Sequence, residues 1–148
     1  MKYQDFVIKN GKFIGEFEKM YQKFDDPWKQ KKEYNSITRQ IVCAYIKHYK
    51  INSVVEFGCG LGATTNFIYK NTGIEILGVD ISETSIKKSK MTYPNLNFQV
   101  NDLENITSYK DYECYFFSEL TWYILEDEKI DKIFEKMKMS LEGKYFIH

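Results

Sequence analysis

Residues 54–65 have the sequence VVEFGCGLGATT, and this stretch determines how the rest of the chain is interpreted. Its first half is a short β-branched and aromatic run, which is typical of a buried strand in a parallel sheet. Gly58, Gly60 and Gly62 follow at alternate positions and lead into a helix. Glycine allows a backbone to turn tightly and approach a ligand closely, and the start of a helix offers unpaired N–H groups. The stretch therefore predicts a strand, a ligand-binding turn and a helix in succession.

Strand and helix patterns alternate along the chain on both sides of this stretch. Strands are expected at residues 53–58, 75–80, 97–102, 112–119 and 144–148. Helices are expected at residues 31–50, 63–70, 83–91 and 128–141, and residues 1–27, which include Phe13 and Phe17, are expected to be helical in part. Ser82 can cap the helix that follows it. Strands separated by single helices predict right-handed crossovers and a doubly wound α/β fold, with a parallel sheet covered on both faces.

Acidic side chains lie at three of the predicted strand ends, where doubly wound sheets bind their ligands. Asp80 ends the second strand, and its carboxylate can accept two hydrogen bonds from a ribose diol. Asp102 ends the third strand and can accept a hydrogen bond from an adenine amino group. Glu56 stands two residues before Gly58, where it would repel a pyrophosphate but attract an ammonium or sulfonium centre. Residues 56–63 contain no basic side chain. The acidic strand ends therefore predict a cationic adenosine ligand without phosphates.

The glycines alone are also compatible with a dinucleotide-binding site. Gly58, Gly60 and Ala63 satisfy the G-x-G-x-x-G/A pattern formally. Asp80 also stands where NAD-binding folds place the carboxylate that binds the ribose. An oxidoreductase that binds NAD or FAD is therefore the alternative enzyme class, and Glu56 and Asp102 argue against it.

Three motifs together resemble the class I S-adenosylmethionine-dependent methyltransferases, over roughly residues 30–148. These motifs are ExGxGxG at residues 56–62, GVDIS at residues 78–82 and NDLEN at residues 101–105. Two further stretches, FDDPWKQKKEYN at residues 24–35 and SELTWYIL at residues 118–125, are similar to the nodulation-protein-S-like small-molecule methyltransferases. The resemblance implies a Rossmann-like, three-layer α/β/α sandwich whose mostly parallel sheet has about five strands in the order 3-2-1-4-5. It also implies an N-terminal helical cap over residues 1–50 and a cofactor-binding core over residues 51–148.

The resemblance further implies the cofactor and the residues that hold it. The cofactor would be S-adenosylmethionine, which leaves as S-adenosylhomocysteine. Its methionine part would be surrounded by Glu56, Gly58, Gly60 and Gly62, its ribose hydroxyls would be bound by Asp80, and its adenine would contact Asp102, Leu103 and Ile81.

The end of the fourth strand lies beside the methyl group and the acceptor in this family. Methyl transfer from a sulfonium is an in-line displacement, so it depends mainly on positioning and on the exclusion of water. Glu119 is the candidate general base or amine-orienting carboxylate, and the alternative is a solvated or capping residue. Trp122, Tyr123 and Trp28 are candidate substrate-binding rings, and the alternative for each is a place in the core. The expected reaction is methyl transfer to an N or O atom of a small molecule, such as a sugar or an amine.

Composition excludes several other classes of partner. Lys and Arg number 21 and Asp and Glu number 21, so a net charge of zero gives no support for nucleic-acid binding. The nucleic-acid amino-methyltransferases of the family carry [DNS]PP[YFW] where this chain has SELTWY. No apolar run is long enough for a signal peptide or a membrane span, so we expect a cytoplasmic protein without a membrane partner. Three cysteines without a CxxC spacing predict reduced, mostly buried thiols and no metal site.

The length of 148 residues corresponds to a single domain. Class I domains usually have seven strands, so we expect a truncated domain that lacks strands six and seven. An exposed fifth strand favours self-association, and we expect a possible homodimer through this edge. A non-catalytic module that binds S-adenosylmethionine, or a regulatory one, is therefore the alternative to an enzyme that methylates a small-molecule acceptor.

Overall fold

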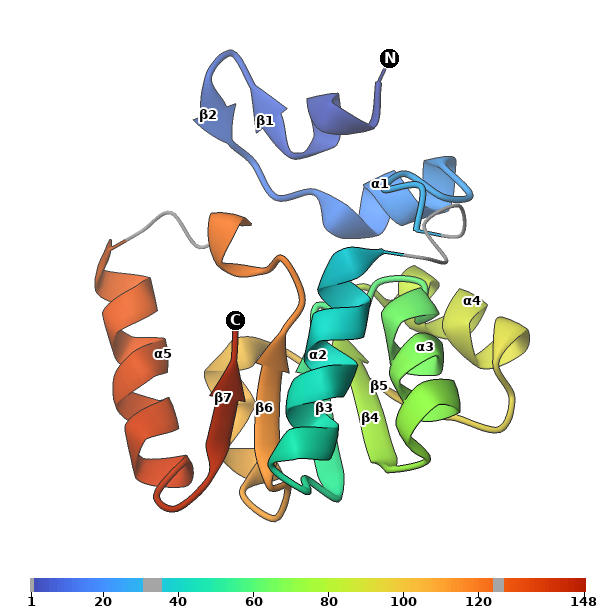
Figure 1. The fold of residues 1–148 in the computed structure, drawn as a ribbon. Helices are drawn as coiled ribbons and strands as arrows, with labels where there is room; N and C mark the ends of the chain where they lie inside the picture. Colours follow the sequence, from blue (N-terminus) through green and yellow to red (C-terminus); the bar gives the residue numbers. More distant parts are fainter. Residues whose placement is uncertain (1, 31–35, 124–126) are drawn as a thin grey trace.

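The computed structural model describes residues 2–30, 36–123 and 127–148, with the side chains of Trp122 and Asp127 left out. Its central feature is a five-stranded sheet in the order β5-β4-β3-β6-β7, in which every neighbouring pair of strands is parallel (Figure 1). The strands are β3 (Ser53–Phe57), β4 (Glu75–Asp80), β5 (Asn97–Val100), β6 (Cys114–Phe117) and β7 (Tyr145–Ile147). Counted along the chain, this is the expected order 3-2-1-4-5, so the prediction of a doubly wound α/β fold is confirmed.

Helices cover both faces of this sheet because alternate strand residues point to opposite sides. The helices are α2 (Ile37–His48), α3 (Ala63–Thr72), α4 (Glu83–Thr92), the 3₁₀ segment η2 (Leu103–Tyr109) and α5 (Asp127–Ser140). Val54 and Phe116 pack with α2 and α3 on one face. Val55 and Phe117 pack with η2 and α5 on the other face. The two apolar clusters on either side of one sheet make the three-layer sandwich that the alternating pattern predicts.

Most element boundaries agree with the sequence to within two residues, and the differences have local causes. Ser82 caps α4 as predicted, since its hydroxyl accepts a hydrogen bond from the Ser85 N–H at 3.1 Å. β5 ends two residues earlier than expected because Asp102 leaves the sheet and caps η2, its Oδ1 accepting from the Glu104 N–H at 3.0 Å. The segment η2 itself is not predicted by the hydrophobic pattern. The thiols of the three cysteines are buried and unpaired, as expected.

The N-terminal segment (residues 2–30) differs most from expectation. It contains a 3₁₀ turn η1 (Tyr3–Phe6), an antiparallel hairpin of β1 (Ile8–Lys9) and β2 (Lys12–Phe13), and only then the helix α1 (Phe17–Lys23). The prediction that Phe13 belongs to a helix is therefore wrong. The hairpin turns at Asn10 and Gly11, whose φ angles of 52° and 74° are those of the two-residue turns that Asn-Gly favours.

Polar contacts at both ends of α1 fasten the N-terminal segment to α4. The Glu18 carboxylate accepts hydrogen bonds from the Ser82 hydroxyl at 2.6 Å and from the Thr84 N–H at 3.1 Å, at the start of α4. Burial raises the pKa of Glu18, but these hydrogen bonds outweigh burial and lower it to about 2. Lys88 donates from Nζ to the Tyr21 and Phe24 carbonyls at 2.7 and 3.0 Å. The segment consequently lies above the carboxyl ends of the strands (Figure 1).

Within the part of the chain that the structure describes, no helix has both the length and the apolarity needed to span a membrane.

Gly62 and Gly73 flank α3 and allow the cost of close packing to be separated from the cost of backbone strain. Both have left-handed φ angles, 76° and 70°, but an added Cβ at Gly62 would lie 2.6 Å from Phe98 Cζ, whereas nothing lies within 4 Å of one at Gly73. We expect Gly73→Ala to lower the free energy of unfolding by about 1–2 kcal/mol through strain alone. Gly62→Ala should cost about 1–3 kcal/mol more through overpacking. Urea unfolding of both variants tests this, and equal losses would contradict it.

Candidate functional site

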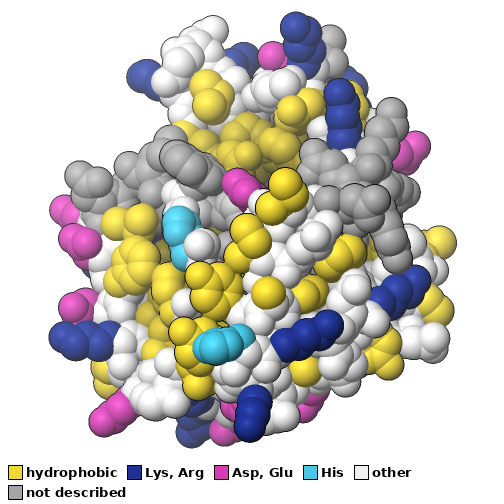
Figure 2. All heavy atoms as spheres, in the orientation of Figure 1, with side chains coloured by type: hydrophobic (Ala, Val, Ile, Leu, Met, Phe, Trp, Pro, Cys, Tyr) yellow, Lys and Arg dark blue, Asp and Glu magenta, His cyan; other side chains and the backbone are white. Residues whose placement is uncertain are grey.

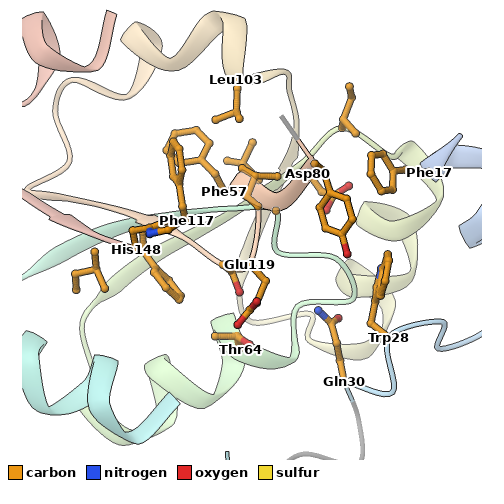
Figure 3. Close-up of a pocket in the computed structure, with 18 of the residues that line it drawn as sticks. Phe17, Trp28, Gln30, Phe57, Thr64, Asp80, Leu103, Phe117, Glu119 and His148 are labelled. Carbon is orange, nitrogen blue, oxygen red and sulfur yellow. The ribbon is translucent and has the colours of Figure 1, made fainter. Parts of the chain in front are cut away.

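A cavity of about 930 Å³ lies at the carboxyl ends of the sheet strands, beneath the N-terminal segment. Phe57, Asp80, Phe117 and His148 line it from the ends of four strands (Figure 3). In Figure 2, hydrophobic side chains gather in a recess between the N-terminal segment at the top and the core below. The volume falls in the range of about 300–1,000 Å³ that is typical of small-molecule sites.

The structure brings most of the predicted site residues to this cavity. The predicted residues that line it are Trp28, Gly58, Asp80, Ile81, Asp102, Leu103, Glu119 and Tyr123. Glu56, Gly60 and Gly62 are buried and are not among the lining residues. The side chain of Trp122 lies outside the described part of the chain, so its predicted role stays a prediction.

The glycine turn (residues 58–62) uses its glycines in different ways. An added Cβ at Gly58 would lie 3.2 Å from Leu120 Cδ1, so this glycine lets the turn pass close to the end of β6. The same position at Gly60 lies 2.7 Å from the Tyr21 hydroxyl and 2.9 Å from Gln30 Oε1. The missing side chain of Gly60 therefore leaves room for Tyr21 and Gln30 of the N-terminal segment, and that of Gly62 leaves room for Phe98. Of the three glycines, only Gly58 borders the cavity.

Asp80 anchors the glycine turn from the end of β4. Its Oδ2 accepts a hydrogen bond from the Gly60 N–H and its Oδ1 accepts one from the Ser82 N–H, both at 2.9 Å. Burial raises the pKa of Asp80, and the hydrogen bonds from Ser82 and Gly60 oppose this rise. Each carboxylate oxygen has a second lone pair, so Asp80 can still accept hydrogen bonds from a ligand.

The end of β5 presents polar groups that are held in place by η2. Asn101 donates from Nδ2 to the Tyr109 hydroxyl at 2.7 Å, and its Oδ1 accepts from the Asp102 N–H at 2.9 Å. One oxygen of Asp102 caps η2, which leaves the other oxygen for a ligand. Leu103 follows and contributes an apolar contact to the same wall of the cavity (Figure 3).

Glu56 is a fully buried carboxylate beneath the glycine turn. Its Oε2 accepts from the Thr65 hydroxyl at 2.6 Å, but its Oε1 has no hydrogen-bond partner among the described residues. Burial raises the pKa of Glu56 to about 7, against the opposing effects of the Thr65 hydroxyl, the nearby Ser118 hydroxyl and the Arg39 guanidinium. A buried carboxylate with an unsatisfied oxygen favours a cationic group nearby.

Arg39 and Gln30 belong to the site although the motifs do not identify them. Arg39 is buried on α2 and lines the cavity, and its Nε donates to the Thr64 hydroxyl at 3.0 Å. Gln30 accepts from the Leu61 N–H in the glycine turn at 3.1 Å. Arg39 shares one helix face with the buried residues Val42, Cys43 and Ile46, so a charge within an apolar stripe is the sequence signal that could have revealed it.

Glu119 and His148 extend into the cavity from the ends of β6 and β7 (Figure 3). Glu119 has a left-handed backbone with a φ of 56°, which is uncommon for a residue other than glycine and often marks a functional position. A ring nitrogen of His148 forms a hydrogen bond with the Thr121 hydroxyl, and the ring stacks on Phe146 with centroids 6.2 Å apart. A carboxylate and an imidazole therefore stand at one end of the cavity.

Comparison with known proteins gives a consistent result. A family model described as "Methyltransferase domain" matches residues 54–143, which is more than half of the chain. "Putative methyltransferase 235L" of Invertebrate iridescent virus 6 is 34% identical over 90 residues, which are 58% of this chain and 33% of that protein. "Malonyl-[acyl-carrier protein] O-methyltransferase 1" of Ilyobacter polytropus is 34% identical over 80 residues, which are 51% of this chain and 30% of that protein. The chain thus spans about a third of the length of these curated relatives.

Solved structures share the fold at lower sequence identity. DesVI from Streptomyces venezuelae superposes with a TM-score of 0.61 at 13% identity, over 70% of this chain and 45% of that chain. The PH0226 protein from Pyrococcus horikoshii OT3 gives a TM-score of 0.60 at 22% identity, over 88% of this chain and 66% of that chain.

The raised pKa of Glu56 predicts how stability depends on pH. The value of about 7 in the folded chain lies above the ordinary 4.5, so the protonated form stabilises the fold. This contribution is complete below pH 4.5 and is lost as the pH rises through 7. We expect the unfolding free energy of the wild type, relative to Glu56→Gln, to fall by up to about 3 kcal/mol over this window. Urea unfolding of both proteins at several pH values measures it, and parallel pH profiles would show that the prediction is wrong.

Proposed function

The chain belongs to the family of methyltransferase domains, and from this premise we propose that it carries out S-adenosylmethionine-dependent methyl transfer to an N or O atom of a small molecule. S-adenosylmethionine is the cofactor of the class I members of this family. Because the chain spans only about a third of its curated relatives, the activity of the whole protein is part of the proposal. The family match removes the support for an oxidoreductase that binds NAD or FAD.

The observation that carries the proposal is the set of acidic groups around the glycine turn. Asp80 and Asp102 line the cavity, and Glu56 lies buried beneath the turn with one oxygen unsatisfied. Such a set opposes a phosphate-containing ligand and favours a ligand with a positive centre and a ribose. Gly58 borders the same cavity, and its missing side chain lets the turn pack closely against Leu120. These groups fit S-adenosylmethionine.

Each part of the cofactor has a matching group in the cavity. We assign the ribose hydroxyls to Asp80 and the adenine to Asp102, Leu103 and Ile81. The buried guanidinium of Arg39 is suited to the carboxylate of the methionine part, because arginine binds carboxylates through paired hydrogen bonds. The carboxylate of Glu56, which lies beneath the turn, would attract the positive sulfonium or ammonium group of the cofactor.

The end of the cavity near Glu119 and His148 is here called the acceptor end. Its side chains position the substrate and accept its proton. The cofactor supplies a methyl carbon that is made electrophilic by a positively charged sulfur. Glu119 orients the acceptor, and His148 can receive the proton that the acceptor loses. Rings from the N-terminal segment exclude water from this end of the cavity. The protein therefore contributes mainly positioning and desolvation.

Binding of S-adenosylhomocysteine, measured by calorimetry, tests the cofactor assignment. We expect Asp80→Asn to weaken binding by about tenfold or more, because hydrogen bonds to a charged group contribute about 1.5–3 kcal/mol. Asp111→Asn, at an exposed turn, is the matched control and should bind like the wild type. Thermal unfolding of the variants checks that the glycine turn is intact.

Two outcomes of this experiment decide between the proposals. Absence of heat at millimolar S-adenosylhomocysteine would exclude the cofactor. Binding without methyl transfer to any amine or sugar would favour the non-catalytic module instead of the enzyme.

We also propose that two copies of the chain associate through the edge of β7. Among the described residues β7 pairs only with β6, and its Tyr145 forms an exposed aromatic group with Tyr49 and Tyr45 of the neighbouring α2 segment. Unpaired strand edges with apolar neighbours favour pairing with a second chain. Light scattering should give twice the mass of one chain at micromolar concentration, and the mass of one chain at millimolar concentration would contradict it.

A further inference from the structure

Four rings and one carboxylate form a subsite at the acceptor end of the cavity. Building on the function proposed above, we propose that the acceptor is a protonated amine on an apolar or planar body, bound between Glu119 and an aromatic wall. The aromatic wall consists of Phe13, Phe17, Trp28 and Tyr123, and all four rings line the cavity.

The aromatic wall is gathered from separate parts of the chain around Tyr123. The Tyr123 ring lies 5.4 Å from that of Phe17, 5.7 Å from that of Trp28 and 6.4 Å from that of Phe13, centroid to centroid. None of these four residues is fully buried, and Phe13 is 38% exposed. Phe17, Trp28 and Tyr123 pack on one side against the apolar cluster of Val7, Met20, Tyr21 and Leu61, and all four rings also line the cavity.

Glu119 places a negative charge beside this wall. Glu119 lies four residues before Tyr123 in the chain, and both line the cavity. Burial raises the pKa of Tyr123, and the Tyr3 hydroxyl and the Glu119 carboxylate raise it further. No hydrogen bond or ion pair to the Glu119 carboxylate occurs among the described residues. Glu119 is exposed, and its carboxylate is therefore accessible to a ligand in the cavity.

A cation gains from both components of the subsite. Ring faces attract an ammonium group through their quadrupoles, and a carboxylate attracts it through its charge. A neutral hydroxyl gains little from either, and an anion is repelled by Glu119. The cationic side chains that line the cavity have other partners than Glu119: Arg39 donates from Nε to Thr64 and is assigned to the cofactor carboxylate, and Lys129 pairs with Glu104 at 3.7 Å.

The proton balance of amine methylation uses His148. A bound ammonium must lose one proton before its nitrogen lone pair can form the new N–C bond, and the His148 imidazole can accept that proton. The electron pair of the broken S–C bond stays on sulfur. Thr121 holds His148 at the same end of the cavity as Glu119.

Benzylamine and benzyl alcohol are matched probes that differ in the charge of the polar group. Calorimetric titrations at neutral pH, with and without saturating S-adenosylhomocysteine, should show benzylamine binding about tenfold more tightly or better. Glu119→Gln should reduce the preference for benzylamine by severalfold, because the carboxylate charge is lost while the attraction of the rings remains. Trp28→Leu, which stays apolar but removes the ring, should weaken benzylamine binding severalfold. Glu142→Gln, at an exposed position remote from the subsite, is the control and should leave the preference unchanged.

The two titrations separate this proposal from the proposed function. Equal affinity for the two probes, no binding of either, or an unchanged preference in Glu119→Gln would overturn the amine subsite. A preference for benzylamine that depends on Glu119 supports the subsite even if S-adenosylhomocysteine does not bind, in which case the proposed function alone fails.

Discussion

The two hydrogen bonds accepted by Asp80 are the constraint on which the site depends. One carboxylate oxygen holds the Gly60 N–H and the other holds the Ser82 N–H, so a single side chain joins the glycine turn to the start of α4. A run of left-handed glycines has many accessible conformations, and this anchor selects the one that opens the cavity. The ribose hydroxyls are assigned to the remaining lone pairs of the same carboxylate. Asp80 thus holds the glycine turn and is also the residue assigned to the ribose.

The N-terminal segment completes the site from above. Glu18 and Lys88 fasten α1 to α4, while Tyr21 and Gln30 reach the glycine turn. The polar strand ends come from the sheet, and most of the aromatic wall comes from residues 2–30. Two parts of the chain, joined by hydrogen bonds between helices, therefore face each other across one cavity.

The sheet and the acidic residues of the site can be predicted from the sequence, because a strand and the residue at its end are both defined by a few consecutive positions. Runs of mostly apolar residues, buried on both faces of the sheet, define β3 and β6. Asp80 is the last residue of β4, and Asp102 lies two residues beyond the end of β5. The hairpin in the N-terminal segment escapes prediction because Phe13 and Phe17 happen to have helical spacing, although Asn10-Gly11 is the stronger local signal. Gln30 reaches the site through a tertiary contact that no spacing reveals. Arg39 has a sequence signal in its place on the apolar face of α2, and His148 has one in its place at the end of the predicted fifth strand. Gly60 and Gly62 are predicted for ligand contact, but the structure assigns their missing side chains to packing against Tyr21, Gln30 and Phe98.

The hairpin of β1 and β2 is structurally separate from the sheet that carries the acidic residues of the site. It carries Phe13 near its end, makes its own antiparallel pairing and takes no part in the five-stranded sheet. Insertions or substitutions there can reshape the acceptor side without disturbing Asp80, the glycine turn or the core clusters. Under the proposed function, changes to the hairpin would alter which acceptor is bound while the residues assigned to the methyl donor stay the same.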